Sequence, residues 1–530
     1  MSSLAGFWQY TRFILERERI TSTIWIVALV GCAVGFASMY PGLFPTEQDI
    51  ATMAQTMNTP AMVALMGPVY GLDSLTVAML MAQDCLIWFA MVAVAMNIFF
   101  VNRYTRTDEE LGRHELFRTL PMGRLTSVAA TMFCVFLVNL IISGLIFAGL
   151  MALNISGTSI LGAFVYSCAI GAVGFCFAAI TLFAAQLLST SRGVLAFAFA
   201  AFGVFYILRA WGDMQGNAAS FASPFGLGLK VSAFYDNNLW PLAVLFGAAI
   251  LFIAVACIVY VKRDLGEGVI PARPGRSHAS LLLTSPLGLA WRLSRNSVLA
   301  WAITALVAGA VYGSVVGELN TFLANNDMIR QMVEGADGSN SLVDSYITML
   351  ISIMAALASV PVINAALKIY SEEKHGRIEQ VYATATQRTG MYAGLVVIAL
   401  LQSVLFMVLT TLGFYAAGAS TGLLDLAVLF KAALVYLPGI WLMLGLSVTL
   451  VGLLPRFTAA IWVVFAYSFM VIYFGRMFKL PDWVVNISPF GSIPQLPIAD
   501  FNAVPLIVLS VLAVALTIVG LAAYQRRDLR

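Results

Sequence analysis

Charged residues are scarce in this sequence of 530 residues, where Asp, Glu, Lys and Arg together make up only 10%. Soluble domains typically contain about 25% charged residues. Apolar residues account for 61% of the chain, and the mean hydropathy is +0.90. A water-soluble fold cannot bury so much apolar surface, and a net charge of only +3 gives no support to nucleic-acid binding. The composition therefore predicts a membrane protein.

Residues that carry metal or catalytic chemistry are also few. The chain has three histidines, and its six cysteines lie inside apolar runs with no close-spaced pair. Such cysteines are typical of small buried hydrophobic side chains, so neither a disulfide framework nor a metal site is indicated. A lipid-modifying enzyme would need a cluster of His, Asp or Glu near one membrane interface, which the sequence does not offer. We expect no catalytic residues and no metal.

Apolar runs long enough to cross a bilayer recur along the whole chain. A membrane-spanning helix needs about 20 consecutive apolar residues. The first run begins near Thr23 and lacks a convincing cleavage site, so we interpret it as a retained helix. The runs predict an all-α polytopic protein with about 12 transmembrane helices, at 23–40, 75–101, 125–153, 158–188, 193–211, 240–261, 297–316, 342–370, 389–418, 423–453, 457–477 and 503–524.

The distribution of Lys and Arg predicts the orientation of these helices. With the spans placed as above, all but six of the 29 basic residues fall on one side of the membrane. Short cytoplasmic loops carry an excess of Lys and Arg. We therefore expect both termini to be cytoplasmic.

The two halves of the chain are related in sequence. Gly112-Arg113 matches Gly376-Arg377, and Arg263-Asp264-Leu265 matches Arg527-Asp528-Leu529, each at a separation of 264 positions. Halves with an even number of spans share one orientation, which predicts two parallel six-helix repeats. The predicted division is a first half at 1–265, a cytoplasmic linker at 266–285 rich in Gly, Pro and Arg, and a second half at 286–530.

The loop after the second span of each half predicts a short cytoplasmic helix. Both loops, 107–124 and 371–388, begin with Thr or Ser followed by acidic residues, which favours a helix N-terminus. An apolar stripe follows, formed by Leu116, Phe117 and Leu120 in the first loop and by Ile378, Val381, Tyr382 and Ala385 in the second. Such a helix suits a lever held by a partner protein. A solvated charged loop that only enforces orientation is the alternative.

A second paired feature precedes each half. Phe7–Arg19 places Gln9, Arg12, Glu16 and Arg19 on one helical face, and Leu287, Trp291, Arg292 and Arg295 repeat the pattern before the seventh span. Helices of this kind lie in the membrane interface.

These residues resemble the type-2 ABC exporter permeases, and among them the fused twelve-span polyketide-antibiotic or tetronasin-type export permeases. The resemblance rests on the interfacial helices, the Glu-Glu-x-x-Gly-Arg-x-Glu segment after the second span, and the Ser-Pro-Phe-Gly stretch before the last. In that family the segment after the second span couples to the ATPase. The resemblance therefore implies coupling roles for Glu109, Gly112, Arg113, Glu115 and Arg124, and for Glu373, Gly376, Arg377, Glu379 and Arg388.

The resemblance also implies the energy source and the cargo. The chain has no Gly-x-x-x-x-Gly-Lys-Ser/Thr phosphate loop, so any ATPase is a separate polypeptide and this chain is not itself an enzyme. The family implies two copies of an ATP-binding-cassette subunit that bind Mg-ATP, with no cofactor in this chain. Its expected cargo is hydrophobic or amphiphilic small molecules, exported across the bacterial cytoplasmic membrane.

Polar and aromatic residues within the spans are candidates for the substrate pathway. An ionisable group at membrane depth is costly and points to function. Asp84 either contacts a cationic or hydroxyl-bearing substrate or forms an interhelical hydrogen bond near the outer end. Asn97 is a further candidate, although amides in spans more often pack helices. The resemblance implies that the second and fifth spans of each half line the pathway, which makes aromatic residues of the fifth and eleventh spans candidates for amphiphile binding: Phe202, Tyr206, Phe465 and Phe469. Contact with lipid or with neighbouring helices is the alternative.

A proton-coupled secondary multidrug transporter is the main alternative function. That class also has two six-span halves and a Gly- and Arg-containing loop after its second span. The acidic helix-like loops and the scarcity of carboxylates within the spans favour the exporter.

Overall fold

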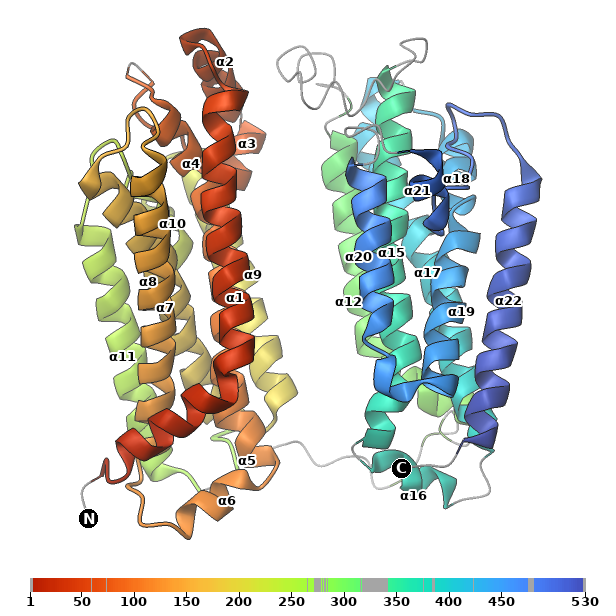
Figure 1. The fold of residues 1–530 in the computed structure, drawn as a ribbon, viewed down its shortest axis with the longest axis horizontal. Helices are drawn as coiled ribbons and strands as arrows, with labels where there is room; N and C mark the ends of the chain where they lie inside the picture. Colours follow the sequence, from red (N-terminus) through yellow and green to blue (C-terminus); the bar gives the residue numbers. More distant parts are fainter. Residues whose placement is uncertain are drawn as a thin grey trace. The chain divides into compact units, whose positions relative to one another are not determined.

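The computed structural model describes residues 3–58, 60–72, 74–264, 266–270, 278, 280, 283, 285–314, 316, 342–374, 376–383, 387–422, 424–474 and 481–527. Within these ranges the chain is all-helical and no strand is formed (Figure 1). Eleven of the described helices are long and apolar enough to cross a membrane, and Ala460–Tyr473 is a shorter apolar helix. The predicted all-α polytopic class is confirmed. Most of the predicted linker at 266–285 lies outside the described residues.

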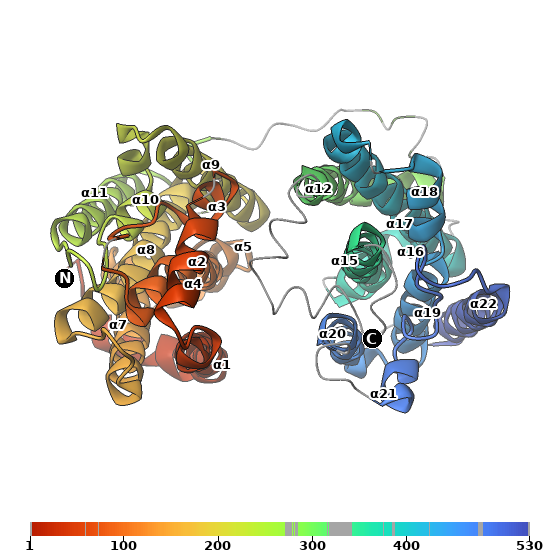
Figure 2. The ribbon, with the colours of Figure 1, turned by 90° about the horizontal axis from the view of Figure 1, so that it is seen from above.

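The chain divides into two compact units, Met1–Gly275 and Arg276–Arg530. The long helices of the first unit are α1 (Phe7–Leu43), α4 (Val77–Asn102), α7 (Thr126–Leu153), α8 (Ile160–Leu187), α9 (Ser191–Gln215) and α11 (Trp240–Lys262). Shorter helices α2 (Glu47–Met57), α3 (Pro60–Met66) and α10 (Pro224–Leu229) lie between them. Helix α8 occupies the middle of this unit, with α4, α7 and α11 packed around it (Figure 2).

The second unit contains α12 (Pro286–Ser314), α15 (Leu342–Lys374), α17 (Arg388–Gly418), α18 (Leu426–Leu434), α19 (Leu437–Leu453), α20 (Ala460–Phe474), α21 (Asp482–Ile487) and α22 (Ala503–Arg526). Helices α12 and α17 approach very closely. A Cβ added to Gly309 would lie 2.1 Å from the carbonyl oxygen of Thr410, and one on Gly413 would lie 2.2 Å from that of Leu306. Small residues at such crossings let two helix backbones pack in contact.

Both predicted interfacial segments are continuous with the spans that follow them. Phe7–Arg19 and the span expected from Thr23 form one helix, α1, whose first turns run at an angle to the rest (Figure 1). Leu287–Arg295 likewise belongs to α12, together with the start of the span expected at 297–316. The span predicted at 423–453 is found at Leu426–Leu453, with a break between α18 and α19. Pro438 near the start of α19 explains this break, because a proline ring clashes with the carbonyl four residues earlier, here Leu434, where α18 ends.

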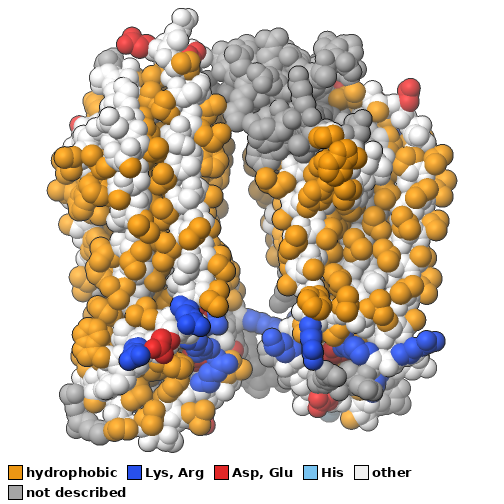
Figure 3. All heavy atoms as spheres, viewed as in Figure 1, with side chains coloured by type: hydrophobic (Ala, Val, Ile, Leu, Met, Phe, Trp, Pro, Cys, Tyr) orange, Lys and Arg blue, Asp and Glu red, His pale blue; other side chains and the backbone are white. Residues whose placement is uncertain are grey.

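Each unit is apolar along its sides and basic at one end. In Figure 3 hydrophobic side chains cover the flanks of each unit, and the Lys and Arg side chains in view gather at one end. We call this the charged end. It carries α6 (Arg113–Arg118) in the first unit and α16 (Arg377–Tyr382) in the second (Figure 1).

Candidate coupling and pathway sites

The second long helix of each unit continues past its apolar part and then turns sharply. In the first unit α4 continues into a π-helical turn, Arg103–Thr107, and a last turn, α5 (Asp108–Glu110). Gly112 then forms the N-cap of α6. In the second unit α15 ends at Lys374, and Gly376 begins α16. The φ angles are +68° at Gly112 and +66° at Gly376, and nothing lies within 4 Å of where a Cβ would stand. Glycine is therefore favoured at both turns by the left-handed backbone alone.

An ion pair closes this turn in the same way in both units. An Arg113 guanidinium nitrogen lies 2.6 Å from a carboxylate oxygen of Asp108, and Arg377 lies 2.6 Å from Glu372. Both acids are buried, and both pairs are five residues apart in sequence. The pair fixes the direction in which the short helix leaves the long one.

A second matched pair ties the second helix of each unit to the last. The Arg263 guanidinium donates to Glu109 at 2.5 Å, and Arg527 donates to Glu373. Both arginines are the C-cap residues of the last helices, α11 and α22. In the first unit the Glu109 and Arg263 side chains are only 3% and 6% exposed. We call these two contacts the Glu–Arg clasps.

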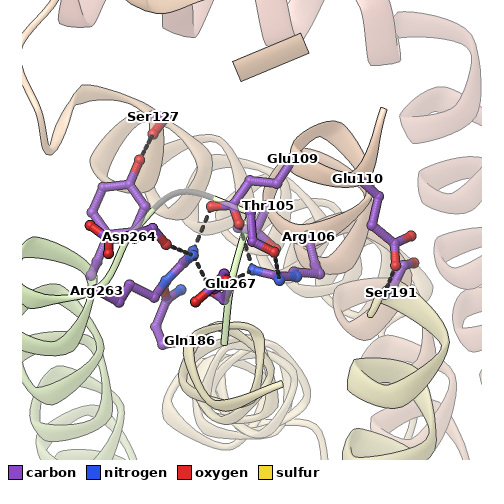
Figure 4. A network of polar contacts seen from close by, with 12 residues as sticks. Thr105, Arg106, Glu109, Glu110, Ser127, Gln186, Ser191, Arg263, Asp264 and Glu267 are labelled. Atoms are coloured by element: carbon purple, nitrogen blue, oxygen red, sulfur yellow. Dashed lines mark hydrogen bonds and ion pairs between the residues drawn. The ribbon is translucent and has the colours of Figure 1, made fainter. Parts of the chain in front are cut away.

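The clasp of the first unit is part of a larger buried network (Figure 4). Arg106, with a side chain 1% exposed, contacts Glu109 at 2.7 Å and donates to the carbonyls of Gly266 at 2.5 Å and Glu267 at 3.2 Å. Arg263 also donates to the side-chain oxygen of Gln186 at 2.8 Å. One carboxylate thus neutralises two buried guanidinium groups. The position 264 residues after Arg106 is Tyr370, so the second unit has no equivalent of this arginine.

The whole chain matches a known transport protein. It is 32% identical to the "Multidrug efflux system permease protein Rv1217c" of Mycobacterium tuberculosis over 538 residues, which cover 100% of this chain and 96% of the relative. The chain belongs to the family of this permease. A family described as "Multidrug efflux system permease Rv1217c, C-terminal domain" also matches residues 283–525. As a member of this permease family, the chain is a multi-pass membrane protein.

The predicted coupling residues of this permease-family chain fall into two groups. Glu109, Arg113, Glu373 and Arg377 belong to the ion pairs described above and brace the charged end from within. Glu115, Arg124, Glu379 and Arg388 are exposed instead. Glu109 and Glu373 are buried and cannot meet another protein without breaking their pairs. The second group can be contacted directly, as can Arg113 and Arg377, whose side chains are 41% and 47% exposed.

The predicted apolar stripes are only partly inward-facing. In the first unit Phe117 packs against the rings of Tyr10 and Phe13, whereas Leu116 is 70% exposed. In the second unit Ile378 is buried, and Ala385 lies outside the described residues. His114 occupies the position of Ile378 in the repeat and is also buried, which lowers the pKa of its imidazole and keeps it neutral at neutral pH. Each short helix is therefore anchored by one buried side chain.

Asp84 forms an interhelical contact. Tyr40 of α1 donates its hydroxyl to the Asp84 carboxylate on α4, and the Cys85 thiol lies 3.5 Å from the same hydroxyl oxygen. The two helices are thereby linked at this level. This contact matches the alternative that the sequence left open beside substrate binding.

The Asp84–Tyr40 contact predicts a mild phenotype for Asp84→Asn. An amide oxygen still accepts the Tyr40 hydrogen bond, so we expect a loss of stability below about 1 kcal/mol and little change in transport. Thermal unfolding of the purified protein and drug tolerance of cells that express it would check this. Lost transport at normal protein level would assign Asp84 to the pathway.

Asn97 is paired within the helix bundle. Its side-chain nitrogen donates to the side-chain oxygen of Asn139 at 3.1 Å, and its side-chain oxygen accepts a hydrogen bond from the Asn139 nitrogen at 2.7 Å. Both residues are buried, and a Cβ on Gly174 of α8 would come within 2.6 Å of the Asn97 nitrogen. The pair packs α4, α7 and α8 together, so its polar groups are occupied by each other.

The four aromatic candidates are half-buried on their helices. Phe202 packs against Phe177 and Phe225, and Tyr206 donates to the carbonyl of Leu65 at 2.9 Å. In the second unit the rings of Phe465 and Phe469 lie 6.2 Å apart on α20. These contacts hold the rings in place and leave part of each exposed.

A buried ion pair lies at the other end of the first unit. Arg209 of α9 is fully buried, contacts Asp213 at 3.7 Å, and donates to the carbonyls of Val63 at 3.3 Å and Leu65 at 2.9 Å. Its guanidinium also lies 4.6 Å from the ring centre of Tyr206. Arg209 therefore fastens α3 to α9 at the end opposite the charged end.

The sequence interpretation missed the partners of the coupling acids. Arg106 was counted only as a positive charge that sets orientation, and Arg263 and Arg527 were used only for orientation and for the internal repeat. Arg263 and Arg527 did carry a signal, because they repeat at the same spacing as Glu109 and Glu373. Arg106 has no repeated counterpart, so the sequence gave no signal for its contact with Glu109.

Proposed function

We propose that this chain is the transmembrane permease of a multidrug exporter that is powered by separate ATPase subunits. It would move hydrophobic or amphiphilic small molecules out across the bacterial cytoplasmic membrane. Support comes from its family, whose full-length relative is named a multidrug efflux system permease, and from the repeated architecture of the charged end. The observation that carries the proposal is the pair of Glu–Arg clasps beside an exposed short helix in each unit.

The clasps supply a physical route for force. A displacement of α6 would be transmitted to the end of α4 through the Asp108–Arg113 pair. The clasp formed by Glu109 and Arg263 would transmit it further to the end of α11. Glu373 and Arg527 do the same between α15 and α22. Buried, charge-assisted contacts of this kind resist separation better than exposed ones, because breaking them leaves a charge unpaired in a poorly solvated site. The long helices would therefore respond to the short helix as one body.

The partner implied by this arrangement binds at the charged end. The excess of Lys and Arg there supports a cytoplasmic location for this end under the positive-inside rule, and both termini would lie on the same side. Two copies of an ATP-binding-cassette subunit would each contact one short helix, through Glu115 and Leu116 in the first unit and through Glu379 in the second. Mg-ATP would bind to those subunits, and this chain would hold no cofactor.

Reversing the charge of both exposed glutamates tests this docking. We expect Glu115→Lys combined with Glu379→Lys to reduce co-purification of the ATPase by at least about tenfold, which corresponds to about 1.4 kcal/mol. Both side chains are exposed, so the permease itself should fold normally. The amount of ATPase and the Mg-ATP hydrolysis that accompany the tagged permease through purification would be measured.

Glu47→Lys is a matched control, because Glu47 is also exposed but lies on α2, far from α6. It should leave ATPase recovery unchanged. Full recovery with the double charge reversal would contradict docking at these helices. Transport by the purified chain alone in vesicles, driven only by a proton gradient, would instead establish the secondary transporter.

A further inference from the structure

A groove near the charged end of the first unit has no role in the coupling or pathway sites described above. It lies between α1 and the end of α4, and its polar lining comes mainly from α1, whereas its aromatic lining comes from both helices. The lining residues are Glu18, Thr21, Ser22, Trp25, Met96, Phe99, Phe100 and Arg103. The groove therefore combines charged and aromatic groups at the end of the unit where Lys and Arg gather.

The charge that a ligand would meet in this groove is positive. Glu18 is only 3% exposed, and one of its oxygens accepts hydrogen bonds from Tyr104 at 2.9 Å and is 2.6 Å from the Arg103 guanidinium. The Arg103 side chain is 44% exposed. Because guanidinium has five N–H donors, Arg103 can bind Glu18 and still donate to a second anion. Glu18 therefore positions the Arg103 guanidinium, and its own carboxylate is buried away from a ligand in the groove.

The rest of the groove is suited to hydrocarbon. The Phe99 ring is 47% exposed, and Trp25 is half-buried beside it. On the same face of α4 as Met96 and Phe99, one and two turns further into the membrane span, lie Val92 and Trp88, 41% and 44% exposed. Side chains of this kind on a membrane-spanning helix face lipid, and tryptophan is enriched at the level of the headgroups.

We propose that this groove binds an anionic phospholipid of the adjacent leaflet, with its phosphate at Arg103 and its acyl chains along α4. Basic pockets between transmembrane helices on the cytoplasmic side are suited to anionic lipid headgroups. A membrane lipid is favoured over a soluble phosphate because the groove continues into the exposed apolar face of α4 that carries Phe99 and Val92. The inference does not depend on how transport is energised.

The second unit lacks the same combination of residues. At the repeat spacings, Ser294 stands in place of Glu18, Leu367 in place of Arg103 and Asn364 in place of Phe100. Only the tryptophan is kept, as Trp301. One lipid site per chain is therefore expected, in the first unit.

Native mass spectrometry of the purified full-length protein in a neutral detergent tests the site. The protein would be titrated with phosphatidylglycerol, with phosphatidylcholine, and with glycerol 3-phosphate as a headgroup without chains. We expect tighter binding of phosphatidylglycerol than of the other two. Arg103→Gln should weaken phosphatidylglycerol binding by about fivefold. Glu18→Gln should strengthen it, because the glutamine keeps a hydrogen-bonding oxygen but removes the competing negative charge.

The matched control is Arg456→Gln, which removes an exposed arginine from the charged end of the second unit. It should leave phosphatidylglycerol binding unchanged. Equal weakening by the Arg103 and Arg456 variants would overturn the proposal, since it would show a general charge effect. Unchanged phosphatidylglycerol binding by the Arg103 variant would also overturn it, while equal binding of glycerol 3-phosphate would indicate an anion site without lipid.

Discussion

Glu109→Gln is expected to destabilise the first unit by about 3–5 kcal/mol, because it leaves buried guanidinium groups without their counter-charge. Arg106 and Arg263 both contact Glu109, and their side chains are 1% and 6% exposed. A glutamine can satisfy some hydrogen bonds but neutralises neither arginine. The melting temperature of the purified protein, followed by tryptophan fluorescence in detergent, would report the loss.

Two comparisons identify the cause of that loss. Glu115→Gln changes an exposed carboxylate a few residues away and should alter stability by less than about 0.5 kcal/mol. Glu373→Gln removes the acid of the second clasp, whose arginine, Arg527, is 18% exposed, so a smaller loss is expected. A melting temperature for Glu109→Gln equal to that of Glu115→Gln would contradict the buried network.

Arg209→Met is expected to have an effect of similar size at the opposite end of the first unit. The substitution leaves the Asp213 side chain, 1% exposed, without its cation and removes two hydrogen bonds to the carbonyls of α3. Breaking a buried ion pair by removing one partner costs about 3–5 kcal/mol. We expect lower protein yield in the membrane and earlier thermal unfolding.

The double variant Arg209→Met with Asp213→Leu separates charge from packing. Replacing both members of a buried pair with apolar residues of similar size is often close to neutral. The double variant should therefore recover more than half of the stability lost by Arg209→Met. If it is as unstable as the single variant, the bonds from Arg209 to Val63 and Leu65 would account for the effect instead of the charge.

The sequence predicted the helices well because the membrane imposes a simple rule. Apolar runs near 20 residues mark spans, and most of the predicted spans coincide with single long helices. The exceptions arise from local chemistry. Phe7–Arg19 reads as amphipathic but has no helix breaker before Thr23, so it remains part of α1, whereas Pro438 divides an otherwise continuous apolar run.

The sites were harder to predict because their contacts are distant in sequence. Glu109 and Arg263 are 154 residues apart, and hydropathy assigned both to solvated cytoplasmic segments. Two of the predicted coupling acids, Glu109 and Glu373, are held inside by their arginines, whereas Glu115 and Glu379 are exposed. Asn97 shows the same limit, because only the position of Asn139 on a neighbouring helix reveals that its polar atoms are already bound.

The clasps also set an order for biogenesis. In each unit the acidic member is synthesised 154 residues before its arginine. Until the sixth long helix of a unit has left the ribosome and inserted, the carboxylate made earlier lacks the arginine of its clasp. The first unit must wait slightly longer, because Arg106 gains its two carbonyl acceptors only once Gly266 and Glu267 have been added. Nascent chains arrested before these residues should therefore keep their second and last helices unlocked.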